Sequence, residues 1–126
     1  MSWEEAKSAC TQDMKGSHLA IIDNENTYQA IFDMTRGQSI WLAGSDAEMD
    51  GKWHWIDDNN VKMEFDFSKW KTSDEARQGG DCLRQGSGGN WRAWECAEMH
   101  LALCQLPQRG NFFLDAFLVT DHCSFC

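Results

Sequence analysis

Residues Asp81–Cys104 read DCLRQGSGGNWRAWECAEMHLALC and contain three of the six cysteines. Alternating apolar and polar residues predict a strand over Cys82–Gln85 and a second over Trp91–Trp94. The glycines between them allow the positive φ angles of a tight turn, so the two strands form a hairpin. Leu101 and Leu103 mark a further short strand at the end of the stretch.

Six cysteines in a chain of 126 residues are typical of a disulfide framework made in an oxidising compartment. A bridge Cys82–Cys96 would close the hairpin, and a bridge Cys10–Cys104 would enclose most of the chain. The sequence alone does not choose among the pairings. The sequence contains no signal peptide, so a secreted or extracellular location is inferred from the cysteines.

Length and charge restrict the function further. The length fits one domain, and the net charge of −9 disfavours nucleic acids and anionic membranes as partners. The longest apolar segment, Phe112–Thr120, is interrupted by Asp115 and is too short to span a bilayer.

Upstream of the hairpin, Ser2 and Glu5 have the spacing of a capping box, which predicts a helix to about Met14. Asp23 and Asn24 can cap a second helix over about Glu25–Thr35. No period is visible from Val61 to Gly80, which predicts a long irregular loop. Short strands are expected over His18–Ile22, Ser39–Gly44 and Lys52–Ile56, with Trp53 and Trp55 facing the core.

These features, in this order, resemble the C-type lectin-like domain. The resemblance covers Ser2 to about Leu106, and its most telling segments are Trp41–Gly44, Gly51–Asp57 and Gly80–Cys82 followed by Trp91, Cys96 and Cys104. It implies an α+β fold of two helices and two small antiparallel sheets with a long loop. It also implies the bridges Cys10–Cys104 and Cys82–Cys96.

The family usually begins with a strand before the first helix, whereas this chain begins at the helix cap. We therefore expect that strand to be missing and the tail segment Phe112–Thr120 to fill the sheet edge it leaves. We divide the chain into a C-type lectin-like domain over residues 1–106 and an apolar, cysteine-containing tail over residues 107–126.

Sugar-binding members of the family hold calcium through carboxylate and amide oxygens, because calcium requires six to eight hard ligands. The positions that match these ligands read Asp74-Glu75-Ala76, Gly80 and Trp91-Arg92-Ala93. The first triplet lacks the family's proline, and Arg92 places a cation where the ion would lie. We therefore expect the calcium-dependent sugar site to be lost.

Some members carry an accessory calcium site, and Asp46, Asp50 and Asp81 match its positions. Three carboxylates leave the shell incomplete, so water would have to supply the remaining ligands. The alternative, which we favour, makes Asp46 and Asp50 ordinary loop acids and gives Asp81 hydrogen bonds to loop amides. No cofactor is therefore expected, and calcium at these acids stays the alternative.

A different surface is suggested by Arg77, Arg84, Arg92 and Trp94, since arginine and tryptophan are enriched in binding hot spots. Its alternative is that Trp94 belongs to the core and that Arg92 pairs with an acid. We take Asp74, Glu75, Arg77, Arg92 and Trp94 as the ligand-contact residues.

The tail ends in His-Cys-Ser-Phe-Cys, and we expect Cys123–Cys126 to form a local bridge, or to link chains into a homo-oligomer, rather than to bind zinc. No catalytic constellation is found, so we do not expect an enzyme. The sequence predicts an extracellular recognition module for a glycan or glycoprotein ligand that works without the usual calcium site. The alternative is a protein-interaction or matrix-assembly module that binds no sugar.

Overall fold

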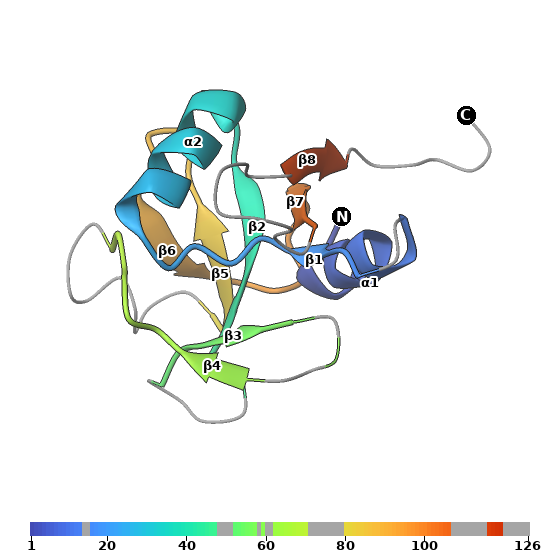
Figure 1. The fold of residues 1–126 in the computed structure, drawn as a ribbon. Helices are drawn as coiled ribbons and strands as arrows, with labels where there is room; N and C mark the ends of the chain where they lie inside the picture. Colours follow the sequence, from blue (N-terminus) through green and yellow to red (C-terminus); the bar gives the residue numbers. More distant parts are fainter. Residues whose placement is uncertain are drawn as a thin grey trace.

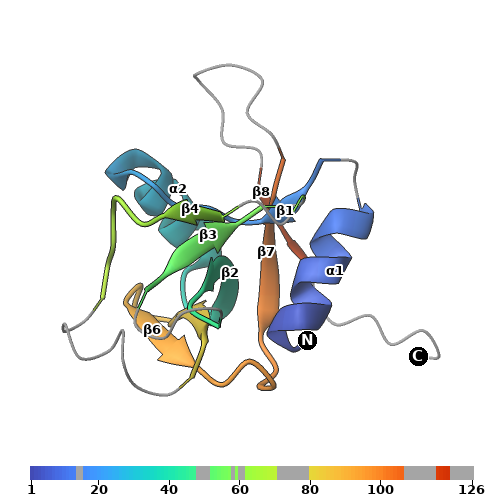
Figure 2. The same cartoon turned by 90° about the horizontal axis from the view of Figure 1, so that it is seen from below.

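The computed structural model describes residues 1–13, 16–47, 52–57, 59, 62–70, 80–106 and 116–119. Two helices flank a central sheet. Figures 1 and 2 show α1 and α2 on opposite sides of the molecule, with strands β2 and β7 between them. In this part of the chain, no helix is both long and apolar enough to cross a bilayer.

Helix α1 (Trp3–Asp13) begins at the predicted capping box. The Ser2 amide donates to Glu5 Oε1 at 2.9 Å, and the Glu5 amide donates to Ser2 Oγ at 3.3 Å. The helix buries Trp3, Ala6 and Cys10, which lie three to four residues apart and so share one face.

Helix α2 (Glu25–Thr35) matches its predicted range, because Asn24 caps it by accepting a hydrogen bond from the Thr27 amide at 2.8 Å. It buries Tyr28, Ile31 and Thr35. The Tyr28 hydroxyl donates to the Gly89 carbonyl at 2.8 Å and so ties the helix to the hairpin turn.

The sheet is organised around β2, which pairs with β3, β5 and β7. In the described residues the strands form one connected sheet, whereas two small antiparallel sheets were expected. The pairing of β2 with β7 is parallel and the others are antiparallel, so the sheet is mixed. The strands are β1 (His18–Leu19), β2 (Ile40–Ser45), β3 (His54–Ile56), β4 (Lys62–Glu64), β5 (Cys82–Gln85), β6 (Trp91–Trp94), β7 (Leu101–Gln105) and β8 (Ala116–Val119).

Strands β4 and β8 lie at edges of the described sheet. Strand β4 lies in the segment expected to be irregular, and it pairs with β3 although all three of its residues are exposed. Strand β8 runs antiparallel along β7, with Leu118 opposite Leu103, so part of the tail fills a sheet edge as expected. Figure 1 shows β8 beside β7.

Disulfides join Cys10 to Cys104 and Cys82 to Cys96, the pairing that the family resemblance implies. The first fixes α1 to β7, and the second closes the end of the β5–β6 hairpin. The expected pair Cys123–Cys126 lies outside the described residues.

An aromatic cluster fills the space between β3–β4 and β5–β6. Trp91 is fully buried, and its ring lies edge-on to Trp55, Phe65, Phe67 and Trp70 at centroid distances of 5.4 to 6.2 Å. Trp91 Nε1 donates to Gln85 Oε1 at 3.0 Å, which satisfies two buried polar groups at once. Trp53 and Trp55 are also buried, at 8% and 1% exposure, as their alternation predicts.

The two disulfides are expected to differ in their contribution to stability. Their sequence separations are 94 and 14 residues, and in the chain-entropy model loops of ~100 and ~15 residues are worth about 4.7 and 3 kcal/mol. Urea unfolding should therefore show a larger loss of free energy for Cys10→Ala with Cys104→Ala than for Cys82→Ala with Cys96→Ala. Equal losses would contradict this assignment of loop sizes.

A pH dependence is expected from His100, whose ring lies edge-on to Trp41 at 5.0 Å between centroids. Burial, together with the positive charges of Arg84 and the terminal amine, lowers the pKa of His100 below 6.5, and Glu98 opposes this only in part. The unfolded chain therefore binds the proton more readily, and the free energy of unfolding falls as the pH drops below 6.5. In His100→Phe this fall should be smaller, as measured by urea unfolding across that range. An unchanged profile would contradict the role of His100.

Candidate functional site

Strand β6 separates its side chains cleanly between two faces. Trp91 and Ala93 are buried, whereas Arg92 and Trp94 are half-buried and share the outward face. The register of the hairpin sets Arg84 of β5 opposite Arg92 and sets Cys82 opposite Trp94. The structure therefore brings together three residues that sequence reasoning grouped, and we call them the Arg84–Arg92–Trp94 surface.

The guanidinium groups of Arg84 and Arg92 both lie over the Trp94 ring. The Arg84 Cζ lies 4.2 Å from the Trp94 ring centroid, and the Arg92 Cζ lies 5.5 Å from it. Both distances are within the range of cation–π attraction, which is worth about 0.5–1 kcal/mol at exposed sites. This attraction offsets part of the repulsion between like charges placed opposite each other on neighbouring strands.

Hydrogen bonds fix the edges of this surface. Trp94 Nε1 donates to Glu98 Oε2 at 2.5 Å, and Arg84 donates through one guanidinium nitrogen to Ser39 Oγ at 3.5 Å. Trp94 also packs partly against the core, so the alternative of a core residue holds in part, while its role in ligand contact stays a prediction. The surface thus presents an indole and two guanidiniums in fixed positions. Such groups can stack on an apolar ring face and can bind carboxylate or sulfate oxygens.

The other predicted contact residues, Asp74, Glu75 and Arg77, lie outside the described residues. Asp50 of the predicted accessory calcium set also lies outside them. Of its other members, Asp46 is buried and Asp81 is exposed, and the Asp46 amide donates to the Asp81 carbonyl at 3.1 Å. Within the described ranges, no three His, Cys, Asp or Glu side chains are placed to hold a metal ion.

The family of the chain is established by comparison with models of known protein families. The model described as Lectin C-type domain matches residues 1–106, which is most of the chain. The chain belongs to the C-type lectin domain family.

Relatives and solved structures of C-type lectins agree with this assignment. The chain is 29% identical over 109 residues to the hepatic lectin of Gallus gallus, covering 85% of this chain and 51% of that protein. It therefore spans about half the length of that relative. It is also 28% identical over 107 residues to a type-2 ice-structuring protein of Brachyopsis segaliensis, covering 82% of this chain and 60% of that protein.

Among solved structures, the carbohydrate-recognition domain of the mouse scavenger receptor C-type lectin superposes with a TM-score of 0.71. It is 28% identical, and the match covers 82% of this chain and 78% of that one. Relatives of this C-type lectin domain therefore include both lectins and an ice-structuring protein.

The described residues at the family's calcium-ligand positions are a poor fit to the ion. Ala93 is 2% exposed and has no side-chain oxygen, and Arg92 carries a positive charge. Gly80 has a φ of 145°, and a Cβ at this residue would collide with the Trp94 carbonyl and lie 2.7 Å from the Glu95 nitrogen. A glutamate at Gly80 would require the backbone to move, which is the physical reason that glycine stands there.

Gly80→Ala is expected to destabilise the domain by about 1–3 kcal/mol, because the residue combines a positive φ with a backbone collision against β6. Gly88→Ala is the matched control, since a Cβ there meets no atom within 4 Å. Urea unfolding of both variants checks the expectation. Equal stability of the two variants would show that the approach of Gly80 to Trp94 is not constrained.

Proposed function

We propose that this chain is an extracellular recognition domain that binds a carbohydrate or glycoprotein through the Arg84–Arg92–Trp94 surface. The observation that carries the proposal is the convergence of two guanidiniums on one half-buried indole at an outward strand face. A secreted location is supported by the two disulfides, which form and persist in oxidising compartments.

The chemistry of this surface suits a sugar. An indole ring packs against the apolar C–H face of a pyranose, while guanidinium N–H groups donate to hydroxyl, carboxylate or sulfate oxygens. Because the cation–π contacts and the bond to Glu98 hold the three side chains, little rotamer freedom is lost when a ligand binds. We include Asp74, Glu75 and Arg77 of the long loop as further contact residues in this proposal.

We also propose that binding does not require the family's usual calcium ion. Support comes from Arg92, Ala93 and the steric closure at Gly80, three positions at which the described residues supply no calcium ligand. Recognition is then an equilibrium binding step, and we assign no catalytic step to the domain.

The second candidate is a protein-interaction or assembly module that binds no sugar. It is favoured by the similarity to a type-2 ice-structuring protein, which is 28% identical to this chain over 107 residues. In that case the Arg84–Arg92–Trp94 surface would contact a protein, and the tail cysteines would join copies of the chain.

A glycan-array screen of the disulfide-bonded chain, run once in calcium and once in EDTA, tests the first proposal. We expect binding in both conditions and a loss of about tenfold or more in affinity for Arg92→Gln and for Trp94→Ala, which are hot-spot residue types. The control Arg36→Gln removes a charge from an exposed pair with Asp33, whose atoms lie 3.2 Å apart, and should bind as the wild type does. Thermal melting confirms that each variant is folded.

Other outcomes of the screen are equally informative. Binding lost in EDTA would contradict calcium independence. Binding unchanged in Arg92→Gln and Trp94→Ala would remove the surface from the proposal. If no glycan binds in either condition, the assembly module is favoured. Non-reducing gels test that module directly, because disulfide bridges between chains would appear as dimers or larger species.

A further inference from the structure

The structure also contains a pocket that is lined by none of the residues of the Arg84–Arg92–Trp94 surface. It is a cavity of about 300 Å³ between α1 on one side and the β3–β4 hairpin on the other, and the end of β2 closes it below. This volume lies at the lower end of the range of small-molecule pockets, which is about 300–1,000 Å³. Its lining includes Trp3, Glu4 and Lys7 of α1, His54, Ile56 and Lys62 of the hairpin, and the Cys82–Cys96 bridge. We call it the α1–hairpin pocket.

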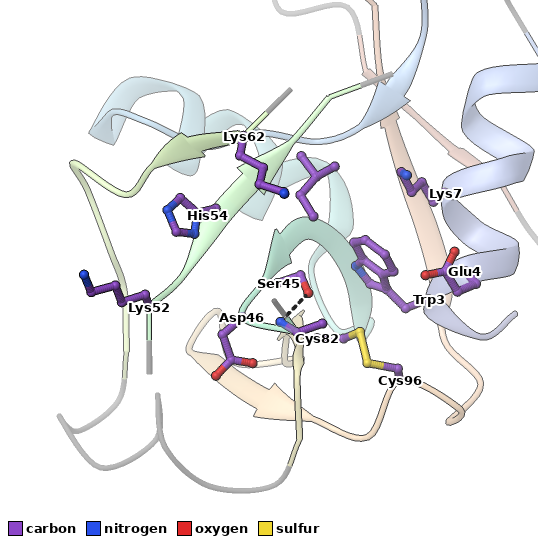
Figure 3. A pocket seen from close by; sticks show the side chains of 12 residues that line it. Trp3, Glu4, Lys7, Ser45, Asp46, Lys52, His54, Lys62, Cys82 and Cys96 are labelled. Carbon is purple, nitrogen blue, oxygen red and sulfur yellow. Dashed lines mark hydrogen bonds between the residues drawn. A yellow bond between two sulfur atoms is a disulfide. The ribbon is translucent and has the colours of Figure 1, made fainter. Parts of the chain in front are cut away.

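Lysines are concentrated in the lining of the α1–hairpin pocket, although the protein is acidic overall. Lys7, Lys52 and Lys62 line it, which is three of the eleven Lys and Arg residues in a chain of net charge −9. Figure 3 shows the Lys7 and Lys62 ammonium groups reaching the cavity from its two opposite walls, whereas the Lys52 side chain extends away from it. Two ammonium groups facing each other across a pocket of this size can both donate to one bound anion.

Geometry of the hairpin keeps this arrangement in place. Ile56 lies opposite Lys62 in the β3–β4 register, so their side chains share one face of the hairpin. That face is the outward one, because the intervening Trp55 is buried with the aromatic cluster. On α1, Lys7 follows Trp3 and Glu4 by one helical turn, so these three side chains lie together on the pocket side.

Apolar groups cover the inner wall of the pocket. Trp3 is 4% exposed, and its Nε1 donates to the Leu42 carbonyl at 2.8 Å, which fixes the indole in one orientation. The Cys82–Cys96 bridge lies beside Trp3 in Figure 3, and Ile56 is a further apolar lining residue. An apolar wall beneath a charged rim suits a ligand with one hydrophobic face and one ionised group.

Acids in the lining limit the charge of that ligand. Glu4 and Asp46 also line the pocket, and of the three lysines only Lys7 and Lys62 reach into it, so the described lining carries no excess of positive charge there. One anionic group held between the two ammonium groups is compatible with this balance, whereas a polyanion is disfavoured. The exposed Glu4 carboxylate accepts hydrogen bonds, which provides a partner for hydroxyl groups.

We propose that the α1–hairpin pocket binds an acidic monosaccharide unit, a sugar ring that carries one carboxylate or sulfate group. Lys7 and Lys62 hold the anion, Glu4 accepts from ring hydroxyls, and Trp3 with Ile56 contacts the apolar ring face. This binding site uses none of the residues of the Arg84–Arg92–Trp94 surface. The proposal can therefore be tested separately from the proposed function.

Amide NMR titration of the full disulfide-bonded chain with glucuronic acid, a glucose sulfate and neutral glucose tests the site. We expect either acid, at up to about 10 mM, to shift the amide signals of Lys7, His54 and Lys62, while glucose leaves them unchanged. Lys62→Gln and Lys7→Gln should each weaken the acid by about tenfold, because each removes one charge-assisted hydrogen bond. Arg36→Gln, the matched loss of one positive charge at an exposed residue, should leave the affinity unchanged.

Several results would overturn the proposal. One is the absence of any shift with both acids, and another is an equal response to neutral glucose. Unchanged affinity in Lys62→Gln, an exposed residue whose replacement leaves the core intact, would do the same. Shifts confined to Arg92 and Trp94 would place acid binding at the other surface and exclude the pocket, while leaving the proposed function in place.

Discussion

The fold depends on the burial of Trp91. Its ring contacts four other aromatic side chains, its indole nitrogen bonds to Gln85, and its backbone amide donates to the Lys69 carbonyl at 2.9 Å. These contacts join the β3–β4 hairpin and the segment up to Trp70 to the β5–β6 hairpin. Because Trp91 points inward, alternation along β6 turns its neighbours Arg92 and Trp94 outward. One buried ring therefore sets both the core and the face on which recognition is proposed.

The same strand shows how packing restricts the residues that we matched to the family's calcium-ligand positions. Ala93 faces inward with Trp91, where a carboxylate would have to be desolvated, and Gly80 lies against the Trp94 carbonyl, where no side chain fits. The Cys82–Cys96 bridge connects this region to the α1–hairpin pocket, since Cys82 lies opposite Trp94 and also lines the pocket. The two proposed binding regions are thus neighbours in the covalent framework while using different side chains.

Local signals in the sequence were sufficient for much of this fold. The caps at Ser2 and Asn24 fixed the starts of both helices, and the alternation of Trp53 and Trp55 identified a buried strand face. Strand β4 could not be predicted, because all its residues are exposed and leave no period of two to detect. The parallel pairing of β2 with β7 is a long-range contact that no local pattern encodes. The stacking of Arg84 on Trp94 likewise depends on the cross-strand register, and the opposed lysines of the pocket depend on the packing of a helix beside a hairpin.

The distribution of tryptophan burial gives the domain a built-in optical reporter. Of the seven tryptophans, five are less than 9% exposed, and only Trp70 and Trp94 are half-buried. A collisional quencher such as acrylamide or iodide in the solvent reaches those two indoles first. Trp94 is also the indole flanked by two cations, so an anionic quencher is concentrated near it. Part of the quenchable emission therefore comes from the face of the molecule that carries Arg92, and a ligand that covers Trp94 on that face would reduce quenching by the anion without an attached dye.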